Sequence, residues 1–112
     1  MHVHLDGARI FNACAELKID PKELVKNCDS VMFCLSKGLC TPIGSIVAGS
    51  REFIAKFNKN RKMLGGILRK PGIVAEMGIY ALNTIRHELG EDNEAARKLG
   101  GRLLSLGWVE IT

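Results

Sequence analysis

The sequence predicts an α/β fold, in which strands and a helix alternate early in the chain and further helices follow. Residues 2–6, "HVHLD", alternate polar and apolar side chains and run into Asp-Gly, which is typical of a short strand ending at Asp6. Residues 29–35, "DSVMFCL", are apolar on both faces, as in a strand of a covered parallel sheet. Helical spacing lies between them, and strand–helix–strand is an α/β order.

The first helix is predicted over residues 8–18, where apolar side chains recur on one side at Ile10, Phe11, Cys14 and Leu17. Asp20-Pro21 then opens a second, short helix, with Asp as its cap and Pro in its first turn. After a turn at Pro42, residues 44–49, "GSIVAG", predict another buried strand. We expect the three strands to form one sheet.

The second half of the chain is predicted to be helical. A helix begins at Ser50 and runs to the break at Gly65-Gly66. Helical periodicity returns over residues 73–89 and closes at Gly90, and residues 91–108 predict a last helix despite two internal glycines. The final residues, "WVEIT", resemble the opening of another strand. Three strands are few for a parallel sheet, so we expect a segment of a larger α/β enzyme.

Composition narrows the class of protein. The chain has 112 residues, 46% of them hydrophobic and 25% charged, which fits one globular domain. No apolar run approaches the roughly 18 residues of a membrane span, and the first residues lack the pattern of a secretory signal. Four cysteines without metal-binding spacing are expected to stay reduced. We therefore predict a cytoplasmic protein that has no membrane partner.

The whole chain has a net charge of +4, and its basic residues gather in one segment. A phosphate-rich partner is one explanation, and cations favoured at the last turn of a helix are the other. Only six aromatic residues are present, so we expect a small-molecule partner rather than nucleic acid. The basic residues are Lys56, Lys59, Arg61, Lys62, Arg69 and Lys70.

Asp6 and Lys37 are the candidate catalytic residues, because each follows a predicted strand at the edge where open α/β sheets bind ligands. A lysine there can form a Schiff base with a carbonyl cofactor, and a carboxylate can pair with a protonated pyridine nitrogen. Pyridoxal 5'-phosphate needs both groups. Taken singly, each has a simpler explanation, since a lysine after a strand is usually solvated and Asp before Gly is usually a turn former.

Three motifs in order give these residues a context. "HLDGARIFNA" (4–13), "FCLSKGL" (33–39) and "RKMLGGILRKPG" (61–72) together resemble the L-threonine aldolases, in the β-eliminating lyase group of fold-type I pyridoxal phosphate enzymes. The resemblance implies a mostly parallel sheet flanked by helices. Residues 1–90 would be the C-terminal part of the large, cofactor-binding domain, and residues 91–112 the start of a truncated small domain.

The resemblance also implies a role for each matching residue. Lys37 matches the lysine that forms the internal aldimine, and Asp6 the carboxylate on the pyridine nitrogen. Arg9 matches the arginine that binds the substrate carboxylate, which suits its planar fork. Lys62 and Arg69 match basic positions on the phosphate side of the cofactor, although helix-end charge remains an alternative for both.

The implied activity is that of an aldehyde-lyase, the retro-aldol cleavage of L-threonine or L-allo-threonine to glycine and acetaldehyde. The family builds its sites at subunit interfaces, so a homo-oligomer, dimer or tetramer, is implied for the whole protein. The family's phosphate-binding turn, its ring-stacking histidine and a second arginine have no match here. A catalytically silent, truncated product is therefore an alternative.

A metal site is the remaining alternative. His2, His4 and Asp6 point to one side of a strand, and His-x-His at a strand end resembles the start of zinc-dependent hydrolases. His87 lies in a predicted helix without a ligand at helical spacing, so no third ligand is evident. This interpretation also leaves "LSKGL" unexplained, and we expect His4 to pack or to support the site instead.

Overall fold

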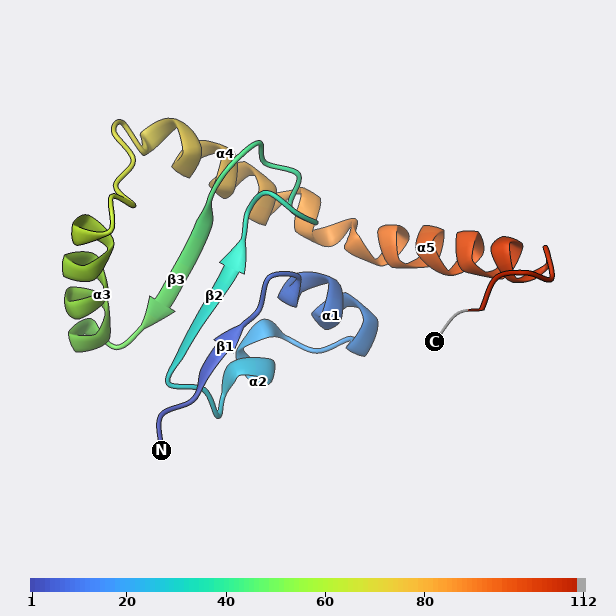
Figure 1. Cartoon of the computed structure of the whole chain (residues 1–112), viewed down its shortest axis with the longest axis horizontal. Helices are drawn as coiled ribbons and strands as arrows, with labels where there is room; N and C mark the ends of the chain where they lie inside the picture. Colours follow the sequence, from blue (N-terminus) through green and yellow to red (C-terminus); the bar gives the residue numbers. More distant parts are fainter. Residues whose placement is uncertain (111–112) are drawn as a thin grey trace.

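The computed structural model describes residues 1–110, and Figure 1 shows the arrangement of its elements. Three strands and five α-helices occur in these residues, with one short 3₁₀ helix, η1. In chain order the elements are β1 (His4–Asp6), α1 (Ile10–Leu17), α2 (Pro21–Val25), β2 (Ser30–Cys34), β3 (Ser45–Gly49), α3 (Arg51–Met63), α4 (Gly72–Asn83), η1 (Ile85–His87) and α5 (Leu89–Leu104). The predicted α/β class is confirmed.

The sheet is mixed, with strand order β1-β2-β3. Strands β1 and β2 are parallel, with Asp6 opposite Met32, whereas β2 and β3 are antiparallel, with Cys34 opposite Ser45. The expectation that β3 would join a parallel sheet was wrong. Residues 35–44 connect β2 to β3 without a helix, and a parallel return needs a crossover of about a dozen residues or more.

Strand β3 is also less buried than predicted. All of its residues are exposed except Val47, which is half-buried. The strand lies at an edge of the sheet, and one side of it faces an open hollow of about 680 Å³ between the sheet, α3 and α4. The apolar run "GSIVAG" predicted a strand covered on both faces. Within residues 1–110, no element covers the exposed side of β3.

Two helix starts follow the predicted caps. The Asp20 side chain accepts a hydrogen bond of 2.8 Å from the Lys22 N–H at the start of α2. The Ser50 hydroxyl accepts one of 3.1 Å from the Phe53 N–H at the start of α3. Both contacts satisfy N–H groups that a first helical turn leaves without a partner, so short polar side chains at these two positions specify where the helices begin.

The predicted helix over residues 73–89 is interrupted. Helix α4 ends at Asn83, and Thr84 leaves the helical region while its hydroxyl donates to the Tyr80 carbonyl at 2.7 Å. The Thr84 N–H still donates to the same carbonyl at 2.9 Å, so helical pairing ends only at this residue. Gly90, expected to end the helix, lies in the first turn of α5 instead. Residues 105–110 form no strand, and Ile111 and Thr112 lie outside the described residues.

The core lies where α4, α5 and the loop after β2 meet. Leu35, Leu39, Ala81 and Leu89 form one buried cluster, in which Leu35 is only 1% exposed. Half-buried side chains surround it, and two of them, Phe11 and Phe33, meet edge to face with ring centroids 5.1 Å apart. The loop that carries Lys37 is therefore held by side chains that reach into the core on both sides of it.

The molecule is elongated. Its radius of gyration is 16.9 Å, against about 13 Å for a compact chain of this length. Figure 1 shows α5 running away from the sheet, with its second half beyond the other elements. None of the helices within residues 1–110 is long and apolar enough to cross a membrane.

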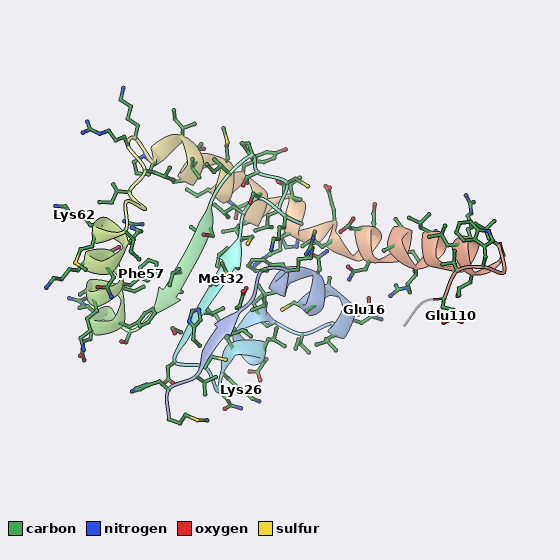
Figure 2. The ribbon with its side chains drawn as sticks, viewed as in Figure 1. Glu16, Lys26, Met32, Phe57, Lys62 and Glu110 are labelled. Carbon is green, nitrogen blue, oxygen red and sulfur yellow. The ribbon has the colours of Figure 1, made fainter. Side chains whose placement is uncertain are left out.

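A group of polar contacts joins α1 to α5, and we call Asn12, Glu16, Asn93 and Arg97 the α1–α5 clamp. The Arg97 guanidinium donates to both Glu16 oxygens at 2.7 Å. The Asn93 side chain donates to the Asn12 carbonyl at 2.9 Å. Figure 2 shows Glu16 at the end of α1 that lies beside α5. The clamp joins residues on either side of the predicted domain boundary at residue 90, which stays a prediction.

Truncating Leu35 should remove a central core contact. We expect Leu35→Ala to lower the free energy of unfolding by about 2–5 kcal/mol, through lost burial and the cavity left behind. Urea denaturation measures this. The matched control is Leu64→Ala, because Leu64 is 86% exposed and should lose little. Equal losses in the two variants would contradict the assignment of the core.

The clamp predicts a pH dependence. Hydrogen bonds from Arg97, aided by its charge, hold the pKa of Glu16 below its usual range. A lowered folded-state pKa adds stability above the unfolded pKa of about 4.3, and this stability is lost as the pH falls through the folded pKa. The difference in melting temperature between the unsubstituted chain and Glu16→Gln should therefore shrink below about pH 4.3. A constant difference from pH 7 to acid would contradict it.

Candidate active site

Lys37 lies in a loop that the core and two backbone hydrogen bonds hold in place. The Cys40 N–H donates to the Lys37 carbonyl at 2.8 Å, and the Thr41 N–H donates to the Leu35 carbonyl at 3.1 Å. Leu35 and Leu39 are buried on either side, while Lys37 itself is exposed. The sequence thus places a free amine on a fixed turn directly after β2.

Gly44 closes the far end of the same loop. The Leu35 N–H donates to the Gly44 carbonyl at 2.9 Å, and Gly44 has φ +118°, a backbone conformation that other residues rarely adopt. A Cβ at this position would also come within 2.9 Å of the Val74 side chain on α4. Only glycine fits both constraints, so Gly44 lets the chain turn back into β3.

Asp6 ends β1, the parallel neighbour of β2. Beyond it, the Gly7 N–H donates to the Met32 carbonyl at 2.8 Å and continues the pairing of the two strands. One oxygen of Asp6 accepts a hydrogen bond of 3.2 Å from the Ala8 N–H, as in an Asx turn. Its other oxygen accepts no hydrogen bond from the described residues. Asp6 is exposed, at the same edge of the sheet as the Lys37 loop.

Arg9 and Lys37 line one open hollow of about 530 Å³ at this edge. Arg9 directly precedes α1, and Lys37 comes from the loop after β2. The other wall is the start of α5, which brings the carboxylates of Glu88, Glu91 and Asp92. Asp6 is not among the lining residues. The structure thus brings Arg9 and Lys37 together and places Asp6 on the adjacent strand end.

Lys62 and Arg69 do not line this hollow. Lys62 is exposed near the end of α3, and Arg69 is exposed in the loop before α4. In Figure 2, the strands lie between Lys62 and the α1 region that holds Glu16. Arg61, their neighbour in the basic segment, lines the larger hollow between the sheet, α3 and α4. Their assignment to the cofactor phosphate stays a prediction.

The two N-terminal histidines have separate surroundings. A ring nitrogen of His4, Nδ1, lies 2.8 Å from the Ser30 hydroxyl. His2 is exposed and lies 3.7 Å from an Asp29 oxygen. The pKa of Asp29 is held below its usual range by the Val3 N–H first, and then by His2. Within residues 1–110 no three His, Cys, Asp or Glu side chains gather as a metal site would require. His4 is itself exposed on β1, so its role in packing or in supporting the site stays a prediction.

Sequence reasoning missed part of the hollow's lining. Ser36, next to Lys37 in the motif "FCLSKGL", could have been predicted to line the hollow. The acidic wall could not, because its residues belong to no motif. That wall exists because the chain leaves α4 at Thr84 and restarts as α5 at Leu89, a break that the helical periodicity of residues 73–89 hides. The unpredicted lining residues are Ser36, Gly38, Cys40, Ile85, Glu88, Leu89, Glu91 and Asp92.

The residues at this edge fit one part of a pyridoxal phosphate molecule. Lys37 takes part in no ion pair within residues 1–110, so its amine is available to an aldehyde. Asp6 has an oxygen free to accept from a protonated ring nitrogen, and Arg9 offers a fork for a carboxylate. The described residues place no cluster of donors for the phosphate in the same hollow. The fit therefore covers the aldehyde and ring side of the cofactor.

The conformation of Gly44 makes a prediction with a matched control. Gly44→Ala should lower the free energy of unfolding by at least about 2 kcal/mol, because alanine tolerates neither the backbone angle nor the contact with Val74. Gly101→Ala should raise it by about 0.5–1 kcal/mol, since Gly101 lies within α5 with open space around it. Chemical denaturation of both variants checks the opposite signs, and changes of the same sign would contradict the loop geometry.

Known proteins match the chain over most of its length. A family model described as beta-eliminating lyase matches residues 1–111. The low specificity L-threonine aldolase of Escherichia coli K12 is 45% identical over 105 residues, which are 94% of this chain and 32% of that protein. The low-specificity L-threonine aldolase 1 of Arabidopsis thaliana is 39% identical over 97% of this chain and 30% of its own length.

A probable low-specificity L-threonine aldolase of Schizosaccharomyces pombe is 46% identical over 80 residues, or 71% of this chain and 21% of that protein. The chain thus spans about a third or less of the length of these relatives. The segment with the exposed lysine, the neighbouring arginine and the aspartate at the strand end lies wholly inside the matched region. The chain belongs to the beta-eliminating lyase family.

Proposed function

We propose that the protein is a pyridoxal phosphate-dependent aldehyde-lyase that cleaves L-threonine or L-allo-threonine to glycine and acetaldehyde. The observation that carries the proposal is that Lys37 and Arg9 line one hollow at the edge of the sheet where Asp6 ends the adjacent strand. An amine, a fork for a carboxylate and a free carboxylate are the groups that this chemistry needs from the protein.

The substrate class rests on the relatives. Those from Escherichia coli, Arabidopsis thaliana and Schizosaccharomyces pombe carry names that specify L-threonine. The geometry is compatible with this substrate, because an amino acid would bring its own carboxylate to Arg9. The acidic side chains at the start of α5 line the opposite wall and disfavour a second carboxylate there.

Pyridoxal phosphate, when bound, supplies a conjugated ring that accepts the electron pair released as the Cα–Cβ bond of the substrate breaks. Lys37 would hold the cofactor's aldehyde carbon through its ε-amine. Asp6 would accept a hydrogen bond from the cofactor's protonated ring nitrogen and keep that proton in place. Arg9 fixes the substrate carboxylate and thereby orients the bond that breaks.

The remaining features of the proposal concern the whole protein. Residues 91–112 are the start of the small domain, and Lys62 and Arg69 serve the phosphate side of the cofactor. A homo-oligomer, dimer or tetramer, and a cytoplasmic location are predictions from the sequence and its resemblance. Many apolar side chains are exposed, among them Ile73, Tyr80 and Trp108. Burial of such side chains against another copy of the chain is compatible with an oligomer.

Covalent trapping tests the proposal. The purified chain is mixed with pyridoxal phosphate and reduced with borohydride, and the modified lysine is located by peptide mass spectrometry. We expect label concentrated on Lys37, lost in Lys37→Ala and kept in Lys26→Ala, since Lys26 lies beyond α2 and away from the hollow. Label spread over many lysines and unchanged in Lys37→Ala would show that the chain does not form the site.

The role of Arg9 gives a second prediction. Arg9→Lys should lower kcat/KM for L-threonine about 10- to 100-fold, because lysine keeps the charge and loses the paired donors. Acetaldehyde release measures the rate. Arg51→Lys, at the start of α3, is the matched control and should leave it unchanged. An unaffected rate in Arg9→Lys would contradict the assignment of the carboxylate to Arg9.

A further inference from the structure

Asn12 lies against the turn that carries Lys37. A Cβ added to Gly38 would overlap the Oδ1 of Asn12, so the α1 side chain occupies the space beside the residue that follows Lys37. The same position would be 3.3 Å from a methyl group of Leu89. Gly38 is thus held between α1 on one side and the first residue of α5 on the other.

The side chain of Asn12 is itself held in place. Its amide nitrogen donates to the Asp92 carboxylate at 3.0 Å and to the Asn93 side chain at 3.3 Å. The Asn93 side chain donates in return to the backbone carbonyl of Asn12 at 2.9 Å. With its nitrogen engaged by α5, the amide can turn only its oxygen toward Gly38.

We propose that Asn12 is a positioning residue for Lys37: clamped by α5, it fixes the backbone at Gly38 and so the direction in which the Lys37 side chain leaves the turn. Asn12 does not line the hollow, so it acts through Gly38. The inference rests on the proposed role of Lys37. Asn12 would then have two roles, since it joins α1 to α5 and also positions Lys37.

Two measurements on the 112-residue chain test it. Amide hydrogen exchange, followed by NMR, reports on the Cys40 and Thr41 N–H groups that close the turn, and needs no cofactor. Borohydride trapping of pyridoxal phosphate at Lys37, measured across pH, reports on the amine itself. Asn12→Ala should speed exchange at both amides and lower the trapped fraction at Lys37, each by about tenfold. Asn27→Ala, a matched change in a residue outside the clamp and the hollow, should do neither.

A double substitution separates positioning from general destabilisation. Gly38→Ala should lower trapping at Lys37, because its methyl group meets the clamped Asn12. In Gly38→Ala/Asn12→Ala the overlap is gone, and part of the trapping should return. Two merely destabilising changes would add instead, so a double variant worse than either single variant would overturn the proposal.

Other outcomes are equally decisive. Unchanged hydrogen exchange at the Cys40 and Thr41 amides in Asn12→Ala would show that Asn12 does not fix the turn, and would overturn the proposal. Faster exchange with an unaltered yield and pH profile of trapping would show that Asn12 does not position Lys37, and would overturn the proposal as well. Absence of trapping in the unsubstituted chain would refute the proposed function instead, and the exchange rates, including those of the double variant, would still decide whether Asn12 fixes the turn.

Discussion

Residues 35–41 are anchored in the core, and this anchoring positions the start of β3 and the packing of α4 and α5. Leu35 and Leu39 are buried in the core, and the Thr41 N–H closes the loop on the Leu35 carbonyl. The loop also reverses the chain into β3, and its buried side chains are the surface on which α4 and α5 pack. Because Lys37 lies between the two buried leucines, the packing that forms the core also places the amine at the edge of the sheet.

The site follows from this anchoring and from one parallel strand pair. Parallel pairing of β1 with β2 brings Asp6 and the start of the Lys37 loop to the same edge, and Arg9 follows within a turn of the chain. Helix α5 supplies the opposite wall and, through Asp92 and Asn93, the hydrogen bonds that hold Asn12 against Gly38. Residues far apart in the sequence thus converge on one short turn.

The sequence predicted the parts of the fold that local chemistry specifies. Asp20 and Ser50 marked two helix starts, and the residues of all three strands were identified to within a few positions. It failed where tertiary context decides. The direction of β3 depends on the short 35–44 connection, and the predicted helix over residues 73–89 breaks where the Thr84 backbone leaves the helical region. Hydrophobic periodicity records neither feature. The sequence predicted that Lys37 and Arg9 share a site. It did not predict the acidic wall, because that wall lies at the start of α5, after the unpredicted break in the helix.

We propose that this chain forms a specific binding place for pyridoxal phosphate at Lys37. Isothermal titration of pyridoxal phosphate into the chain tests it most directly, with Lys37→Ala and Lys26→Ala compared under the same conditions. We expect saturable binding at one site per chain, lost in Lys37→Ala and retained in Lys26→Ala. Binding that is unsaturable, or equal in Lys37→Ala and the unsubstituted chain, would contradict it.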